Sequence, residues 1–141
     1  MSKKSFFNIG ILLLVLSLAL PLAACRVRQA RITNFVDMPV YGAQHNSLAQ
    51  AQVRKVILDA CAKRDWVARE IAPGLISATI DVRNKHMAQV EIAYSGTSYS
   101  IIYKNSSNLK YDASTNTINR SYNTWVTNLR QDIDVGLAKI R

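Results

Sequence analysis

The stretch ISATIDVRNKHMAQVEIAYSGTSYSIIYK, residues 76–104, decides the fold of this chain. Apolar side chains occupy every second position at its start, and the same alternation resumes twice after short polar interruptions. A period of two indicates strands that bury one face of a sheet and expose the other. The predicted strands are 66–71 (closed by the turn dipeptide Pro73-Gly74), 76–82, 88–94 and 99–103.

The parity of the residue numbers tests whether these strands can pair as neighbours. The inward positions of the second and third strands are even-numbered, so their loop must hold an odd number of residues, as 83–85 does when Val82 pairs with His86. The inward positions of the fourth strand are odd-numbered, so the next loop must be even, as either 95–98 or 96–97 is. Because a slip of one residue would expose every apolar side chain of a strand, this agreement favours an antiparallel meander.

Helical periodicity flanks the predicted sheet on both sides. Before it, apolar residues recur at helical spacing over 47–63, and Ser47 and Gln50 have the spacing of a capping box, with Ser47 as the N-cap. After it, a longer apolar stripe predicts a helix over 117–140. Gly136 lies inside this stripe at a cost of about 1 kcal/mol relative to alanine, so we expect the last turn to fray.

These elements predict an α+β fold with the order α-β-β-β-β-α, in which a four-stranded antiparallel meander carries two helices on one face. The other face should be open to water. Residues 36–41 are too apolar for a linker and could add an edge strand, where Pro39 is tolerated. The side chains predicted on the open face are Ser77, Thr79, Asp81, Gln89, Glu91, Ser100 and Lys104.

The N-terminus has the pattern of an export segment. Lys3 and Lys4 precede the uncharged stretch Phe6–Ala24, and Pro21 breaks it before small residues. Its 19 residues are marginal for a spanning helix, which needs about 20 apolar residues, so a single N-terminal membrane helix is the alternative. Leu22-Ala23-Ala24-Cys25 resembles the lipobox of bacterial lipoproteins.

The resemblance implies a processing route. Leu22, Ala23 and Ala24 would be recognised by the signal peptidase, and Cys25 would carry diacylglycerol and become the mature N-terminus. Two or three acyl chains hold a protein stably on a membrane, whereas one gives marginal binding. Arg26 stands where an aspartate would resemble an inner-membrane retention signal. The implied location is the periplasmic face of the outer membrane in a Gram-negative cell, or otherwise the outer face of the plasma membrane.

The chain is therefore expected to have three parts. Residues 1–24 form a cleaved signal peptide, 25–45 the lipidated cysteine and a tether, and 46–141 a single α+β domain. As a flexible coil, residues 26–45 would span roughly 25 Å. A domain of this length can bury a core without metals or disulfides.

Charge and cysteine content exclude several classes. Removing residues 1–24 leaves 16 Lys+Arg against 9 Asp+Glu, a net charge of +7. The cations are scattered and no nucleic-acid recognition motif is present, so we exclude nucleic acid as a partner of this exported chain. Arg26, Arg28 and Arg31 lie beside the acyl chains, where they would favour an anionic surface. Acylation of Cys25 leaves Cys61 without an intramolecular disulfide partner, and we expect it to pack as a small hydrophobe.

No catalytic or metal-binding set is apparent in the sequence. His45 and His86 lie in no metal-ligand spacing, and we expect His86 to be structural. Asp81 and Glu91 could approach one another on the open sheet face, but an exposed pair beside cations is a surface charge network rather than an acid–base site. We therefore expect a protein that is not an enzyme and that needs no metal and no cofactor other than its acyl chains.

The tyrosines and one polar loop offer the remaining candidates for binding. Most of the aromatic side chains are in phase with the buried faces, which indicates core positions with hydroxyls at the rim. The loop predicted over 105–116 is least tied to the core. Its candidate contact residues are Asn105, Ser106, Asn108 and Tyr111, of which Ser106 and Asn108 could instead brace the loop through side-chain-to-backbone hydrogen bonds.

The motifs around these residues resemble a pattern in small bacterial lipoproteins. Tyr99-x-Ile101-x-Tyr103-x-x-Ser106-x-Asn108-Leu109 and Tyr122-Asn123-x-Trp125-Val126-x-Asn128-Leu129 carry the resemblance, which covers roughly residues 46–135 and implies no particular activity. The leading hypothesis is a non-enzymatic lipid-anchored domain that binds another envelope component through the open sheet face or the 105–116 loop. The alternatives are a periplasmic small-ligand or glycan binder with a tyrosine-rimmed cleft between helices and sheet and, more remotely, a hydrolase.

Overall fold

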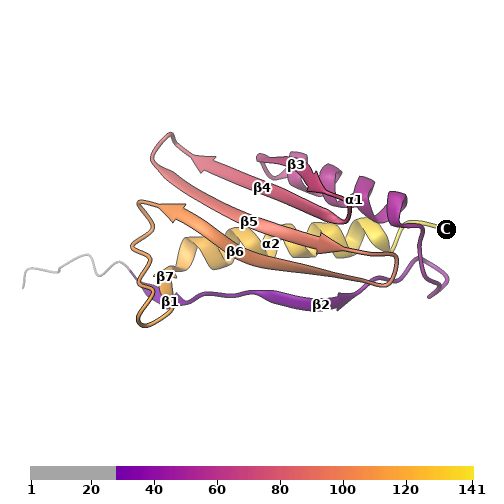
Figure 1. The fold of residues 1–141 in the computed structure, drawn as a ribbon, viewed down its shortest axis with the longest axis horizontal. Coiled ribbons are helices and arrows are strands. Elements are labelled where there is room, and N and C mark those ends of the chain that lie inside the picture. Colours follow the sequence, from indigo (N-terminus) through magenta and orange to yellow (C-terminus); the bar gives the residue numbers. More distant parts are fainter. Residues whose placement is uncertain (1–27) are drawn as a thin grey trace, which may run out of the picture.

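The computed structural model describes residues 28–141, so the expectations for residues 1–27, including Cys25, lie outside the described residues. Two helices cover one face of a five-stranded antiparallel sheet, and a short two-stranded ribbon closes one end of the molecule (Figure 1). The sheet order is β2-β6-β5-β4-β3, and β1 pairs with β7. The elements are β1 Gln29–Arg31, β2 Phe35–Pro39, α1 Gln50–Lys63, β3 Trp66–Ala72, β4 Leu75–Val82, β5 His86–Tyr94, β6 Ser98–Ser107, β7 Thr117–Asn119 and α2 Arg120–Leu137.

The predicted α+β fold and its central meander are confirmed. Val82 pairs with His86, which leaves a three-residue turn between β4 and β5. Tyr94 pairs with Tyr99, so the next connection spans the four residues 95–98 rather than 96–97. The even-numbered side chains of β4 and β5 are therefore buried beneath the helices, as the parity of the sequence requires.

Strand β6 runs further than predicted because it contains a bulge. Val90 pairs with Tyr103 but Gln89 pairs with Asn105, so Lys104 is an additional residue in β6. Beyond it the parity of β6 changes, and Ser106 pairs with the buried Ala88. The predicted loop residues at 105 and 106 thus belong to a strand.

The segment expected to be a tether contains two strands. Strand β2 pairs with β6 and makes the sheet five-stranded instead of four-stranded, which confirms the edge strand considered for residues 36–41. Strand β1 pairs with β7, in register Ala30 with Ile118. Within the described residues, the fold therefore includes β1 and β2 and extends well before residue 46.

Helix α1 begins later than predicted. Its N-cap is Ala49, not Ser47, and the amide of Ala49 donates to Oε1 of Gln52 at 3.0 Å. The expected cap position was wrong because residues 47–49 are extended to meet the sheet, where the Leu48 amide donates to the carbonyl of Gly96. Burial of Leu48 thus delays the first helical turn.

Helix α2 is preceded by β7 rather than starting at residue 117. Its N-cap is Asn119, whose side chain accepts a hydrogen bond from the Ser121 amide at 3.0 Å. The helix ends at Leu137, one residue after Gly136, and residues 138–140 are not α-helical, in agreement with the expected fraying of the last turn. A Cβ added at Gly136 would lie 2.6 Å from Cγ1 of Val56, so glycine is what lets α2 approach α1 this closely.

The core lies between the sheet and the two helices. Its side chains come from every layer, and the stripe of α2 is almost completely inaccessible to solvent. On the opposite face of the sheet Asp81 and Lys104 are exposed, and most of the other predicted polar side chains are partly exposed. Ser77 is buried and accepts a hydrogen bond from Gln89 at 3.0 Å, because it is small and lies between longer neighbours. The buried α2 residues are Tyr122, Val126, Leu129, Ile133 and Leu137.

The close approach of Gly136 to Val56 predicts that the effect of Gly136→Ala on the free energy of unfolding changes sign with the residue at position 56. Gly136→Ala should lower the free energy of unfolding by about 1 kcal/mol, because overpacking of roughly 1–3 kcal/mol exceeds the helix-propensity gain of about 1 kcal/mol. With Val56→Ala as the background, the same change should instead be stabilising. Urea denaturation of the four proteins measures both effects, and an unchanged sign would show that the contact does not limit the packing.

Candidate functional site

The predicted contact loop lies at one end of the molecule, which we call the N-terminal pole. It comprises β1, β7, the turn 83–85 and the loop 108–116 (Figure 1). Backbone and side-chain hydrogen bonds join these segments: the Arg120 amide donates to the carbonyl of Arg28 at 3.0 Å, and Nε2 of Gln29 donates to the carbonyl of Lys110 at 2.8 Å. Segments about 80 residues apart in sequence therefore form one surface.

Asn108 has the bracing role that was one of its two predicted possibilities. Its side-chain Nδ2 donates to the carbonyl of Lys85 at 2.7 Å, which ties the loop to the β4–β5 turn. Its own carbonyl accepts a hydrogen bond from Nδ1 of His86 at 2.9 Å, so the imidazole is structural, as expected. Asn108 also has a positive φ of 55°, a conformation that asparagine tolerates better than most residues.

The other three predicted residues divide between structure and surface. The Ser106 hydroxyl lies 2.9 Å from that of Tyr103, and the Tyr103 ring packs on Tyr111 with ring centroids 4.8 Å apart. Asn105 accepts a hydrogen bond from the amide of Ser106 at 2.8 Å and is exposed. Tyr111 keeps 43% of its surface exposed, so it and Asn105 are available to a partner.

The sequence did not single out the asparagines that hold the N-terminal segment. Asn123 of α2 accepts from the amide of Thr33 at 3.0 Å and donates to the carbonyl of Arg31 at 2.7 Å. Asn34 accepts from the amide of Tyr103 at 2.9 Å. Asn123 belongs to a motif quoted from the sequence, but without this role, and the exposed Asn34 has no signal beyond a short polar side chain of a kind found throughout the chain.

The carboxylates that could have formed an acid–base pair are separated. Asp81 pairs with Met87 whereas Glu91 pairs with Ser77, so the two lie four residues apart along the strands, about 13 Å. The expectation that they approach one another was wrong. Glu91 instead forms an ion pair with Lys104 at 3.1 Å. Within residues 28–141, no cluster of three or more histidine, cysteine or acidic side chains is arranged to hold a metal ion.

Of the three core tyrosines, Tyr94 lines a small pocket of about 220 Å³ between the start of α1 and the β3–β4 turn. Tyr94, Tyr99 and Tyr122 are each less than a tenth exposed, and side chains from both layers fill the space around them. The Tyr99 hydroxyl donates to Asp134 and the Tyr94 hydroxyl to Glu70, each at 2.5 Å. These three tyrosines therefore belong to the hydrophobic core.

Cys61 has no exposed surface and makes no disulfide in the described residues. Burial raises the pKa of its thiol to about 12, so the thiol stays protonated at neutral pH. A protonated, inaccessible thiol is not a nucleophile. Cys61 is the small hydrophobe that the sequence predicted.

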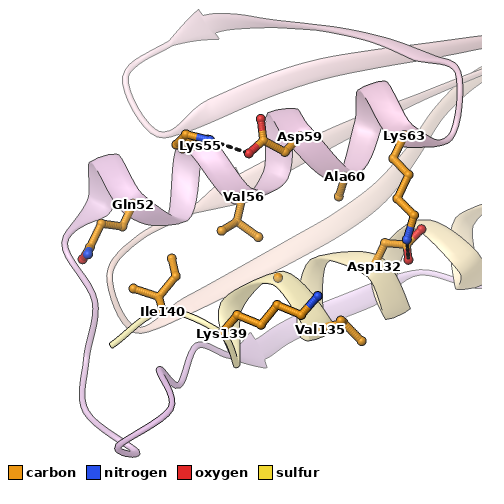
Figure 2. Close-up of a pocket in the computed structure, with 11 residues that line it drawn as sticks. Gln52, Lys55, Val56, Asp59, Ala60, Lys63, Asp132, Val135, Lys139 and Ile140 are labelled. Atoms are coloured by element: carbon orange, nitrogen blue, oxygen red, sulfur yellow. Dashed lines mark hydrogen bonds and ion pairs between the residues drawn. The ribbon is translucent and has the colours of Figure 1, made fainter.

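A groove of about 490 Å³ lies between α1 and α2 (Figure 2). Its floor is apolar and includes Val56, and at one side Val135 is 52% exposed. Charged side chains from both helices stand around this floor, with Lys139 reaching across the view from the end of α2. The lining residues are Gln52, Lys55, Val56, Asp59, Ala60, Lys63, Asp132, Val135, Gly136, Lys139 and Ile140.

Most charged side chains of this groove form ion pairs within the described part of the chain, but one lysine does not. Asp132 accepts from Lys63 at 2.8 Å and also binds Arg64, and these bonds lower its pKa to about 2. Lys55 pairs with Asp59 on the surface of α1 at 2.6 Å. Lys139 forms no ion pair with any carboxylate among residues 28–141, so the groove presents a free cation above an apolar floor.

The low pKa of Asp132 predicts how stability depends on pH. Its folded-state pKa of about 2 lies below the ordinary value of 3.8, so its contribution is present above pH 4 and is lost as the pH falls toward 2. Asp132→Asn should reduce the free energy of unfolding by about 1–2 kcal/mol at pH 7, allowing for solvent screening of the exposed cations, and by much less near pH 2. Asp59→Asn removes an exposed pair and should change it by less than about 1 kcal/mol. Denaturation curves at both pH values test this; an equal loss at each would exclude the ion pairs as the cause.

Comparison of the chain with protein-family models, with curated proteins and with solved structures found no match in any of the three. Among residues 28–141, no helix is long and apolar enough to cross a membrane. The proposals that follow therefore depend on the motifs and geometry described above.

Proposed function

We propose that this protein is a lipid-anchored, non-enzymatic domain of the bacterial cell envelope that binds another envelope component. The observation that carries the proposal is the distance in sequence between the lipobox and the folded domain. Strand β1 begins at Gln29, four residues after Cys25, and is bonded to β7 in front of α2. An acylated Cys25 would therefore attach lipid almost directly to the folded domain.

The reach of this connection is short. Four residues span at most about 14 Å when fully extended. The roughly 25 Å tether expected from residues 26–45 is not available, because β1 and β2 lie within it and pair with β7 and β6. A domain attached in this way would remain at the surface of the bilayer, on the periplasmic face of the outer membrane in a Gram-negative cell.

The dispersed carboxylates and the protonated Cys61 favour a binding role over hydrolysis. Among the surfaces of the domain, we assign the partner to the groove between α1 and α2. It combines an apolar floor, the exposed Val135 and the unpaired Lys139, which suits a protein segment that carries apolar side chains and a carboxylate. Its lining comes from α1, the C-terminal half of α2 and the residues that follow α2 (Figure 2).

A small amphiphile in the same groove is the second candidate. A volume of about 490 Å³ is within the range of small-molecule sites, and an anionic head group could meet Lys139. This candidate replaces the tyrosine-rimmed cleft as the location for a ligand.

The anchor is tested by Cys25→Ser. The variant should lose lipid labelling and processing by the signal peptidase, because the serine hydroxyl cannot form the thioether to diacylglycerol. Metabolic labelling with a fatty acid and separation of membranes by density measure both. Undiminished labelling of the variant would contradict the proposal, and Cys61→Ser is the matched control that should label normally.

The partner surface is tested with two exposed valines. A photo-crosslinking amino acid at Val135, in the groove, should give a protein adduct in intact envelopes, whereas one at Val67, 78% exposed on β3, should give none. An adduct at Val67 alone would move the interface to the sheet. Adducts to lipid or small molecules alone at Val135 would favour the amphiphile, and no adduct at either position would contradict partner binding by these surfaces.

A further inference from the structure

The cations of the N-terminal pole differ from those of the rest of the domain. All six are exposed, and none forms an ion pair within residues 28–141. Of the nine remaining Lys and Arg residues in that range, six are paired with carboxylates. The pole cations are Arg28, Arg31, Arg83, Lys85, Lys110 and Arg120.

The fold brings these cations together from three separate segments. The Arg120 amide donates to the carbonyl of Arg28, and the carbonyl of Lys110 accepts from Gln29. Asn108, two residues before Lys110, binds the carbonyl of Lys85 in the β4–β5 turn. The hydrogen bonds that build the pole therefore also gather its charge.

The neighbouring carboxylates do not neutralise this surface. Asp112 lies in the loop, where hydrogen bonds from Ser114 lower its pKa, and Asp81 and Asp65 lie at its margin, beside the ends of β4 and β3. Six cations against three carboxylates leave a net charge of +3. Tyr111, 43% exposed, adds an aromatic side chain of the kind enriched at membrane interfaces.

We propose that the N-terminal pole is a second membrane contact, which lies on a bilayer surface of anionic phospholipids with its cations on their phosphates. The inference rests on the proposed acylation of Cys25, because β1 then holds the pole within about 14 Å of the acyl chains. This reach is nearly two screening lengths of about 8 Å at physiological salt, so the cations interact with the surface charge when the short link brings the pole onto the bilayer. The contact gives the domain one orientation on the membrane.

The test uses the acylated protein in vesicles of phosphatidylcholine, with and without phosphatidylglycerol, that carry a head-group quencher. A fluorophore on Ala113→Cys reports the pole, and one on Gln44→Cys reports an exposed position outside it, since Cys61 is buried. We expect several-fold stronger quenching at residue 113 than at residue 44 on anionic vesicles. The difference should shrink on neutral vesicles and at high salt.

Two triple variants with the same change in net charge separate the pole from charge in general. Arg83→Glu/Lys110→Glu/Arg120→Glu should abolish the preference for anionic vesicles. Arg54→Glu/Arg69→Glu/Arg141→Glu, made at exposed cations outside the pole and the groove, should retain it. Equal loss in both variants, or quenching at residue 113 that is independent of lipid charge and salt in the unsubstituted protein, would overturn the inference.

Flotation of the same vesicles separates the two proposals. If the protein did not float with neutral vesicles, the proposed acylation of Cys25 would be overturned. If it then bound only anionic vesicles, the contact between the pole and anionic phospholipid would still be supported. Circular dichroism shows whether each variant is folded, and the salt titration of the unsubstituted protein tests the pole without any substitution.

Discussion

Burial of the apolar stripe of α2 determines where every other part of the domain lies. An isolated helix of 18 residues is marginal in water, so α2 depends on its contacts for stability. Its five buried side chains are at most 2% exposed, and each of the four aliphatic ones contributes about 1.5–3 kcal/mol by leaving water, whereas the buried Tyr122 hydroxyl has no hydrogen-bond partner among the described residues. The same helix meets the sheet along this stripe, α1 at Gly136 and the N-terminal segment at Asn123.

The sheet could be predicted where the alternation of apolar and polar residues is uninterrupted. Alternation and parity specified β4, β5 and the start of β6, because a shift of one residue would bury the wrong side chains. The same logic missed the bulge at Lys104, since an inserted residue changes the parity without changing the local composition. It also missed β1 and β7, which are three residues each and are stabilised by pairing between segments distant in sequence.

The predictions of the two helix boundaries and of the candidate site were wrong or incomplete because these features depend on contacts between segments distant in sequence. Ser47 has the local spacing of an N-cap, but the Leu48 side chain is buried in the core and its amide donates to the carbonyl of Gly96. Gly136 looks like a weak point by propensity, and only the position of Val56 shows why glycine is needed. Bracing was one of the two roles predicted for Asn108, and His86 was expected to be structural, whereas the clustering of Arg28 with Lys85 depends on hydrogen bonds that no local pattern reveals.

The geometry makes the membrane contact and the partner groove compatible. Helix α2 starts at the N-terminal pole and, with 18 residues at about 1.5 Å each, extends about 27 Å away from it (Figure 1). The groove lines the far half of this helix, near the C-terminus. If the pole lies on the bilayer, Val135 and Lys139 face the aqueous side at a distance from the lipid. A flexible tether would leave that direction undefined, whereas a short link together with a charged pole would present the groove to other components of the envelope.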